Sequence, residues 1–317
     1  MTVDLTAFAL GRAWKTPVLA ASGTFGYGQE YEGLTDLSAL GGIVTKGLSP
    51  RPRAGNPLAR ICETPSGMLN SIGLENVGVE GFLRGKLPFL RALGTRVVVN
   101  FFGERFEEYA ECAALLDGHE GIDALEMNVS CPNIKAGGME YGTDPETLRR
   151  LVASCRRATR LPLIVKLTPN VTDIVAIARA AVDGGADGLA VINTVSGMAI
   201  DARARRPKLA TIFGGLSGPA VKPIAQRMVY QVARARLGVP IFGMGGIRTG
   251  EDAAEFLLAG ATLVQVGTWN FVDPDATARV ARELAAFLAE VGCARPADLV
   301  GKLELDESLL PHTPGGP

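Results

Sequence analysis

Eight short apolar runs, spread along the whole chain, limit the folds that this sequence can adopt. Each run has four or five residues, and helix-length segments separate most of them. Short, mostly apolar runs that are rich in β-branched residues are typical of parallel strands buried on both faces of a sheet. The runs are Val18–Ala21, Gly42–Thr45, Arg96–Asn100, Ala124–Asn128, Leu163–Lys166, Gly188–Ile192, Pro240–Gly243 and Leu263–Val266.

The segments between the runs carry helix signals. The clearer helical segments are Phe106–Leu116, Pro145–Ala158, Thr172–Val182, Pro219–Ala235, Gly250–Leu258 and Asp275–Glu290. Candidate N-caps are Asp144, Thr172 and Asp273. Eight strands that alternate with helices predict an α/β protein with a (β/α)8 or TIM barrel. A doubly wound open sheet is the alternative, and the lack of a GxGxxG motif after the first run counts against it.

The 317 residues fit one barrel with loops inserted at the face formed by the carboxyl ends of the strands. We therefore expect residues 1–317 to form a single domain. The first 15 residues are expected to form a short lid or hairpin over the barrel bottom. The segment Leu48–Gly78 is too long for a simple connection and is expected to help build the active site. The polar, Pro- and Gly-rich tail, residues 306–317, is expected to be flexible.

Charge and cysteine usage narrow the class of protein. The 32 basic and 33 acidic residues leave a net charge of -1, which argues against a nucleic-acid binder. The N-terminus does not resemble a signal peptide, and no apolar stretch reaches the roughly 18 residues of a membrane span. The five cysteines form no CxxC pair, which indicates free thiols in a reducing cytoplasm and predicts no metal site.

Polar residues and glycines stand where the apolar runs stop. In a barrel of this kind the functional side chains lie at the carboxyl ends of the strands, so these residues are predicted to converge on one rim. They are Ser22, Lys46, Asn100, Asn128, Lys166, Asn193, Gly245–Gly246 and Gly267–Thr268.

The glycines on this rim predict a phosphate site. "GMGGI" follows the seventh run and "VGT" the eighth, and the loops there hold the phosphate in many such barrels. Glycine allows backbone N–H groups to approach an anion closely. Gly218 precedes a predicted helix, whose positive N-terminus adds to the attraction. A phosphorylated cofactor fits this pattern better than a phosphorylated substrate.

The lysines and asparagines on the rim indicate what the rest of that ligand is. Lys46 and Lys166 are expected to point into the barrel mouth. There a lysine forms a Schiff base, as in an aldolase, or stabilises negative charge on a ligand such as a reduced flavin. Asn70, Asn128, Asn133 and Asn193 offer amide donors and acceptors that match a pyrimidine. In "EMNVSCPNIKAGG", Cys131 lies between two of these asparagines on a Gly-rich loop, which makes it a candidate catalytic thiol.

These residues together resemble the dihydroorotate dehydrogenase family. The likeness runs from about Val18 to Phe271 through "TKGLSPRPRAGNPLARICETPSGMLNSIGLEN", "NVSCPN", "VKLTPNVTDI", "NTVSGMAIDARARRPKLATIFGGLSGPAVKPIA" and "GMGGI", in the family's order. "GMLNSIGLEN" and "GMAIDARARRPKLA" resemble the catalytic subunit of its class 1B branch. The resemblance implies an oxidoreductase of pyrimidine (UMP) biosynthesis that oxidises (S)-dihydroorotate to orotate with FMN.

The resemblance also implies roles for individual residues. Cys131 would be the base that removes the C5 proton, and Lys46 would assist catalysis. FMN would contact Ser22, Lys46, Gly47, Asn100, Asn128, Lys166, Ile192, Gly218, Gly245, Gly246, Gly267 and Thr268. The substrate would contact Lys46, Asn70, Ser71, Ile72, Gly73, Leu74, Asn128, Asn133, Asn193 and Thr194.

The class 1B likeness implies a partner chain as well. Electrons would pass to NAD through a second subunit that carries FAD and a [2Fe-2S] cluster, in a heterotetramer of two plus two chains. Two other functions stay open at this point. One is a flavin barrel similar to the dihydrouridine synthases, which should be more basic because it binds tRNA. The other is a barrel that binds a phosphorylated ligand without catalysis.

Overall fold

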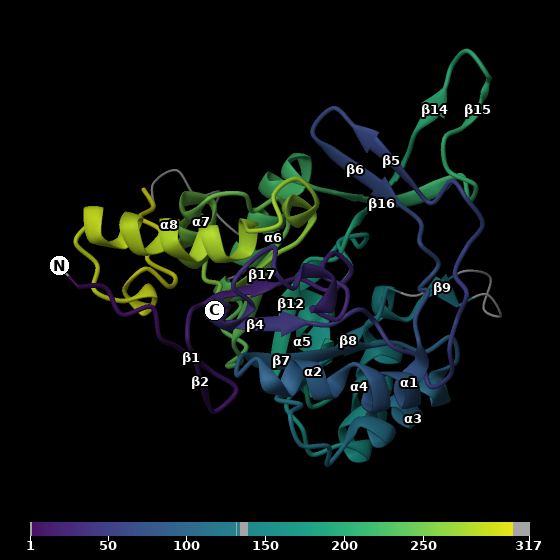
Figure 1. The fold of residues 1–317 in the computed structure, drawn as a ribbon, viewed down its shortest axis with the longest axis horizontal. Coiled ribbons are helices and arrows are strands. Elements are labelled where there is room, and N and C mark those ends of the chain that lie inside the picture. The colour runs from purple at the N-terminus through teal and green to yellow at the C-terminus, as the bar shows by residue number, and fades with distance from the viewer. Residues whose placement is uncertain (1, 131, 134–138, 307–317) are drawn as a thin grey trace, which may run out of the picture.

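The computed structural model describes residues 2–130, 132–133 and 139–306, which contain a closed barrel of parallel strands (Figure 1). Each of the eight predicted runs forms one strand, with ends within one residue of the expected positions. The predicted (β/α)8 barrel is therefore confirmed, and β18 pairs with β3 to close it. The barrel strands are β3 (Val18–Ala20), β4 (Gly42–Val44), β7 (Arg96–Phe101), β8 (Ala124–Asn128), β11 (Leu163–Lys166), β12 (Gly188–Val191), β17 (Ile241–Met244) and β18 (Leu263–Val266).

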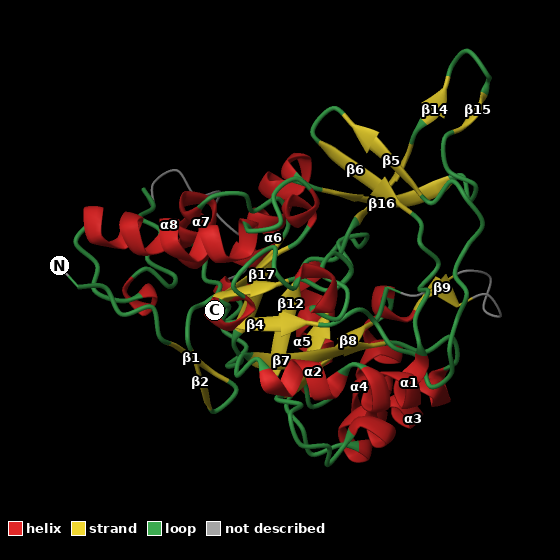
Figure 2. Ribbon diagram, in the orientation of Figure 1, coloured by secondary structure: helices red, strands yellow, loops and turns green. Residues whose placement is uncertain are grey.

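Helices pack around the outside of the barrel (Figure 2). They are α1 (Gly78–Gly85), α2 (Leu87–Ala92), α3 (Phe106–Leu116), α4 (Pro145–Ala158), α5 (Ile174–Asp183), α6 (Lys222–Arg234), α7 (Gly250–Leu258) and α8 (Ala276–Glu290). Asp144 caps α4 as predicted. Two other predicted caps were wrong: Asp173, rather than Thr172, caps α5, and Asp273 lies ahead of the N-cap position of α8, which Asp275 occupies.

The barrel strands bury both of their faces, as their apolar sequences predict. Alternate side chains face the helices or the barrel interior, because side chains along a strand point to opposite faces. On β7, for example, Val97 and Val99 belong to the helix-facing core, whereas Val98 belongs to a separate cluster inside the barrel. The same alternation turns Asn100 inward at the end of that strand.

The amino ends of the strands are closed by an N-terminal hairpin, which confirms the expected lid at the barrel bottom. Strands β1 (Ala7–Ala9) and β2 (Arg12–Trp14) pair in antiparallel fashion and carry the fully buried Trp14. The Trp14 ring meets Phe242 edge-on inside the barrel, and its indole N–H donates to the Ala9 carbonyl at 3.1 Å. This plug leaves the opposite, carboxyl-end face for the site.

A second sheet stands over that face (Figure 1). It contains β5 (Ile61–Thr64), β6 (Gly67–Asn70), β13 (Val195–Met198) and β16 (Phe213–Ser217) in the order β13-β16-β6-β5. The inserted segment after β4 thus pairs with the segment after β12, far away in the sequence. Two further hairpins, β14 (Ile200–Asp201) with β15 (Arg206–Pro207) and β9 (Pro132–Asn133) with β10 (Met139–Glu140), complete the strands. Among the described residues, no helix has the length and apolarity needed to cross a membrane.

Candidate active site

Three of the predicted rim residues meet at the mouth of the barrel. The register pairs Lys166 with Asn128 across β11 and β8, and Asn100 with Glu126 across β7 and β8. Registered residues of parallel strands point to the same side, so all four side chains face inward. Asn100 and Lys166 are almost fully buried, at 1% and 6% exposure. The barrel therefore directs one lysine and two amides toward its mouth.

Directly below this rim lies Glu126, which the sequence analysis did not single out. Its Oε1 accepts a hydrogen bond from Asn100 Nδ2 at 2.7 Å and lies 3.5 Å from Lys166 Nζ. Its Oε2 accepts from Gln265 Nε2 at 2.7 Å. The signal was available: Glu126 is a charged residue inside an apolar run and lies two positions before Asn128, hence on the same strand face.

Two predicted site residues, Asn128 at the end of β8 and Asn193 just after β12, are hydrogen-bonded to each other. Asn193 Nδ2 donates to Asn128 Oδ1 at 3.1 Å and to Ser130 Oγ at 2.9 Å. Asn193 Oδ1 accepts from the Thr194 backbone N–H at 2.9 Å. Tyr109 of α3 supports the arrangement, because its hydroxyl donates to the Asn128 carbonyl at 3.0 Å. The result is a pre-formed cluster of amides and hydroxyls beside the start of the Cys131 loop.

The second sheet brings the predicted substrate loop, residues 70–74, to this cluster. Asn70 ends β6, and its Nδ2 donates to the Gly215 carbonyl at 3.2 Å. A Cβ on Gly215 would lie 2.1 Å from Thr194 Oγ1. Strand β16, whose Gly215 carbonyl binds the Asn70 side chain, therefore also packs against Thr194. Asn70 and Thr194 are therefore neighbours in space although they come from different insertions.

The rest of the loop is fixed by its own turn. Gly73 has φ 76° and Leu74 has φ 58°, both in the left-handed region. A Cβ at Gly73 would lie 2.4 Å from Asn56, so only glycine fits there. Asn56 in turn donates to the Ser71 carbonyl and hydroxyl at 3.1 Å, and its backbone N–H donates to the Ile72 carbonyl at 3.0 Å.

The loops after the first two barrel strands complete this side of the rim. Ser22 and Lys46 are half-buried, and the Lys46 N–H donates to the Gly26 carbonyl. A Cβ at Gly47 would lie 2.7 Å from Asn100 Oδ1, so the glycine gives the Asn100 amide room to approach. Ile192 is buried, and its N–H donates to the Met244 carbonyl at 3.2 Å, which places it beside the glycine loop after β17.

The predicted glycines of the phosphate site do come together. Gly218, Gly245 and Gly246 all have positive φ, at 96°, 125° and 81°. A Cβ on Gly246 would lie 3.0 Å from the Gly218 carbonyl and 2.9 Å from the Lys222 N–H. Gly267 has an ordinary φ of -110° and precedes Thr268, whose hydroxyl donates to Ser217 Oγ at 2.8 Å. Loops after β16, β17 and β18 therefore meet at one corner that is suited to an anion.

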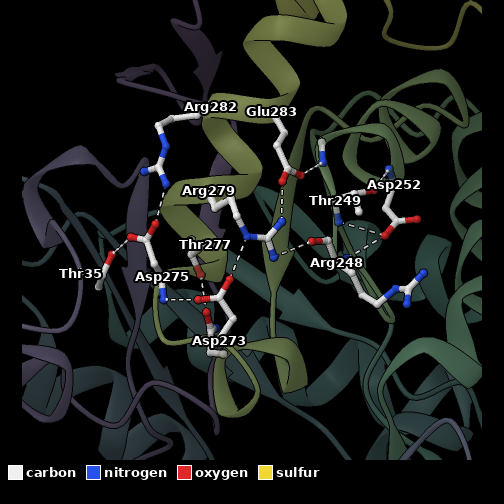
Figure 3. Close-up of polar contacts among 12 residues, drawn as sticks. Thr35, Arg248, Thr249, Asp252, Asp273, Asp275, Thr277, Arg279, Arg282 and Glu283 are labelled. Atoms are coloured by element: carbon white, nitrogen blue, oxygen red, sulfur yellow. Dashed lines mark hydrogen bonds and ion pairs between the residues drawn. The ribbon is translucent and has the colours of Figure 1, made fainter.

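A network of ion pairs and helix caps connects the loop after β17 to the segment after β18 (Figure 3). Arg279 of α8 donates to Asp273 at 2.8 Å, to Glu283 at 2.5 Å and to the Arg248 carbonyl at 3.2 Å. Glu283 also accepts from the Gly250 N–H, and Asp275 accepts from Arg282 and Thr35. The start of α8 is thereby tied to the loop that carries Gly245 and Gly246.

Helix α7 begins inside the same network. Thr249 and Asp252 form a capping box, and Asp252 also accepts from Lys222 Nζ at 2.6 Å. Burial by itself would raise the pKa of the Asp252 carboxyl, but the hydrogen bonds from Lys222 and from the Arg248 N–H outweigh it and lower that pKa. Burial likewise opposes the charge of Lys222, yet its hydrogen bonds to Asp252 and Glu255 raise the pKa of the ammonium. Both partners stay charged beside the glycine corner formed by Gly218, Gly245 and Gly246.

Two predicted site residues cannot be placed as side chains. Cys131 lies outside the described residues, and so do residues 134–138 of its loop. Asn133 belongs to β9, of which only the backbone pairing with Met139 is described. Most of the expected tail, residues 307–317, also lies outside. Among the described residues, no group of His, Cys, Asp and Glu could hold a metal ion.

Fold and site define a class of protein: a (β/α)8 barrel enzyme with an anion corner, a buried lysine and an amide cluster at one mouth. Comparison with known proteins narrows this class. The model of the family described as dihydroorotate dehydrogenase matches residues 5–288. The chain therefore belongs to the dihydroorotate dehydrogenase family.

Similarity to curated relatives covers almost the whole chain. It is 55% identical over 96% of its length to the full-length "Dihydroorotate dehydrogenase B (NAD(+)), catalytic subunit" of Pelobacter propionicus. It is 56% identical over 95% of its length to the protein of that name from Geobacter sulfurreducens, 99% of which is covered. These matches confirm the resemblance drawn from the sequence motifs, including its class 1B branch. They favour that function over a dihydrouridine synthase or a non-catalytic barrel.

Proposed function

We propose that this chain oxidises (S)-dihydroorotate to orotate with FMN as its cofactor, as the catalytic subunit of a complex that delivers electrons to NAD. The observation that carries the proposal is the joining of three features at one barrel mouth. These are the glycine corner, the buried Lys166 and the amide cluster around Asn128 and Asn193. We take residues 1–317 as one FMN-binding domain, because the barrel strands run from Val18 to Val266 with the N-terminal hairpin packed beneath them.

The chain's residues suit the parts of FMN. Gly218, Gly245, Gly246, Gly267 and Thr268 would hold the phosphate through backbone N–H groups and a hydroxyl. Lys166 lies 3.5 Å from Glu126, longer than the about 2.7–2.9 Å of a charged N–H···O bond, so its ammonium keeps donors for the ring. Ser22, Lys46, Gly47, Asn100, Asn128 and Ile192 would line the ring. Bound FMN supplies the acceptor for the hydride that leaves C6 of the substrate.

The amide cluster would orient the substrate. A pyrimidine ring with alternating carbonyl and N–H groups needs donors and acceptors in fixed positions, and asparagine supplies both. Asn128, Asn193 and Asn70 come from three different elements, and the bonds at Asn193 and Asn70 already fix their amides. Lys46, Ser71, Ile72, Gly73, Leu74, Asn133 and Thr194 would complete the substrate contacts. Such preorganisation orients the substrate before reaction and thereby lowers the barrier.

Cys131 would remove the proton from C5 at its Sγ. The described residue before it supports this role: Ser130 Oγ accepts from Asn193 Nδ2, so the loop leaves the amide cluster at that point. A thiol needs a lowered pKa, or a proton loss coupled to hydride loss, to act as a base near neutral pH. Lys46, which follows β4, would contribute positive charge to the site.

A partner subunit would carry the electrons onward. The relatives are named catalytic subunits of an enzyme that uses NAD(+), and such a name implies a second chain. The sequence has no CxxC pair, so the [2Fe-2S] cluster would lie on that partner, together with FAD, in a heterotetramer of two plus two chains. We also propose a cytoplasmic location, which the free thiols of Cys62, Cys112, Cys155 and Cys293 support.

The first test is spectroscopic. The purified chain should be yellow and should release close to one FMN per chain, and dihydroorotate added without oxygen should bleach it. The orotate formed should equal the flavin reduced. A colourless protein that takes up no added FMN would contradict the proposal. If the isolated chain reduced NAD efficiently, the assignment of electron transfer to a partner subunit would be contradicted.

A further inference from the structure

The two carboxylate oxygens of Glu126 face different sides of the barrel interior. Oε2 accepts from Gln265 on β18, across the barrel from β8. Oε1 is shared by Asn100 Nδ2 at 2.7 Å and Lys166 Nζ at 3.5 Å, from the two strands that flank β8. Gln265 thus anchors one oxygen, while the other touches two residues of the proposed flavin site.

Because Glu126 is buried, its hydrogen bonds and its charge act strongly on the residues around it. Glu126 is fully buried, and a buried carboxylate is strongly destabilising unless hydrogen bonds and a positive charge compensate it. The two amide donors and Lys166 provide that compensation. Conversely, Glu126 offsets part of the Lys166 charge in an interior of low dielectric, where charges act strongly on one another.

The contact with Asn100 also fixes which end of its amide faces the site. Because Nδ2 is bound to Glu126, Oδ1 points the other way, where it would lie 2.7 Å from a Cβ on Gly47. Asn100 therefore offers an acceptor toward the Gly47 loop. If the carboxylate were lost, the amide would be free to turn and offer its donor instead.

We propose that Glu126 is a positioning residue that offsets the positive charge of Lys166 and fixes the orientation of Asn100 toward the flavin ring. The inference rests on the proposed binding of FMN. An uncompensated ammonium beside the ring would favour the reduced, more negative flavin too strongly. Glu126 moderates that effect, so the flavin accepts a hydride readily and still gives its electrons away.

The chain offers a variant that removes the charge and little else. In Glu126→Gln, the new amide keeps an oxygen for Asn100 and turns its NH2 toward Gln265. Gln265 Oε1 is buried and has no hydrogen-bond partner within the described part of the chain. A flip of the Gln265 amide would present this oxygen to the new NH2, so the network can re-form without the negative charge.

The matched control lies on the same polypeptide stretch. Asp123 precedes β8, at the amino end of the barrel, and pairs with Arg96 at 2.7 Å and Arg12 at 3.4 Å. Asp123→Asn also removes one partly buried, ion-paired carboxylate. Three residues of strand, roughly 10 Å, separate it from Glu126. Its loss should lower thermal stability without changing the flavin.

The experiment measures the midpoint potential of bound FMN by anaerobic dye titration, together with the Kd of FMN. For Glu126→Gln we expect the ratio of reduced to oxidised flavin at a fixed potential to rise at least tenfold. That is a positive shift of about 30 mV for a two-electron couple. The Kd of oxidised FMN should change less than threefold. Asp123→Asn should keep the wild-type potential.

The measured FMN potentials of the Glu126 variants support or overturn the inference. A Glu126→Gln variant that holds FMN at the wild-type potential, or at a more negative one, overturns the inference even if its Tm falls. If that variant does not fold, Glu126→Asp serves instead. Glu126→Asp keeps the negative charge but moves it away from Lys166. A positive shift of the FMN potential, smaller than that expected for Glu126→Gln, would support the role, whereas an unchanged potential would reject it. A wild-type chain that binds no FMN would remove the proposed function itself, and this inference with it.

Discussion

Asn193 donates from a single nitrogen to Asn128 at 3.1 Å, although 65 positions separate the two residues in the sequence. The bond joins the ends of β8 and β12, two strands that are not neighbours in the barrel. The same nitrogen reaches Ser130, the last described residue before Cys131. One amide thus links the proposed substrate contacts to the loop that would carry the base.

Replacing that amide should impair the use of substrate more than the binding of cofactor. Asn193→Ala removes the donor to Ser130 Oγ and one of the two donors to Asn128 Oδ1, which keeps the Ser130 N–H, at a cost of about 1–3 kcal/mol. We expect kcat/KM for dihydroorotate to fall about 10- to 100-fold in steady-state assays. FMN content per chain, measured on the same samples, should equal that of wild type. A variant that loses FMN in parallel would place Asn193 in the cofactor site instead.

Removing the proposed base should separate binding from chemistry. Cys131→Ala is expected to keep FMN and to bind orotate, but to slow flavin reduction by dihydroorotate at least about 100-fold in anaerobic stopped-flow. Cys293→Ala is the control, since Cys293 is a half-buried free thiol that follows α8. Equal reduction rates in the two variants would rule out Cys131 as the base.

Thiol reactivity should sort the cysteines by burial. Burial raises the pKa of Cys155 to about 12, and it raises the pKa of Cys112 further. Because the thiolate is the reactive form, neither should be alkylated in the folded protein near pH 8. Cys62 and Cys293 are half-buried and should react before Cys112 and Cys155. Peptide mass mapping after iodoacetamide treatment checks this, with all five cysteines labelled in denaturant. Early labelling of Cys155 would show that α4 does not protect it.

The glycine corner should not tolerate a side chain. At Gly246 an alanine would be held at φ 81° and its Cβ would lie 2.8 Å from Lys222 Cβ. The expected cost in unfolding free energy is about 1–3 kcal/mol, together with weaker FMN binding. Gly85→Ala is the control, because that position has open space and an ordinary φ. Urea unfolding and FMN titration of both variants give the comparison, and equal behaviour would show that the corner is looser than described.

The Asp252 ion pair should contribute to acid sensitivity. Its folded pKa is lowered from 3.8, so its contribution to stability is complete above that value and is lost as the pH falls through the folded pKa. Wild-type unfolding free energy should therefore fall more steeply below about pH 4 than that of Asp252→Asn. The variant should be less stable at pH 7, where Lys222 has lost its charged partner. Parallel acid slopes in urea titrations would refute the assignment.

The barrel was predictable because its strands are simple in sequence. Each run is mostly apolar, and each ends in or is followed by a polar residue or glycine, so the ends alone located Asn100, Asn128 and Lys166. The glycine loops were found for the same reason: a close approach to an anion needs residues without a Cβ. The inserted sheet was not predicted strand by strand, because β6, β13 and β16 contain Gly67, Gly197, Gly214 and Gly215 and show no clear alternation.

Other features depend on contacts that a linear pattern does not reveal. Helices α1 and α2 were missed because they have only eight and six residues, and because the glycines of α1 weaken its helix signal. The role of Glu126 depends on Gln265, 139 positions later, and only the closure of the barrel brings them together. The bond between Asn70 and Gly215 likewise needs two insertions to meet.

The plugged bottom of the barrel has a practical consequence for optical experiments. The chain has two tryptophans. Trp14 is sealed beneath the barrel, whereas Trp269 is half-buried next to Thr268, with Arg248 5.3 Å from its ring. Emission from Trp14 should therefore follow global unfolding, and emission from Trp269 should follow the binding of a ligand at the glycine corner. Trp14→Phe and Trp269→Phe turn the protein into two separate fluorescent sensors, one for each end of the barrel.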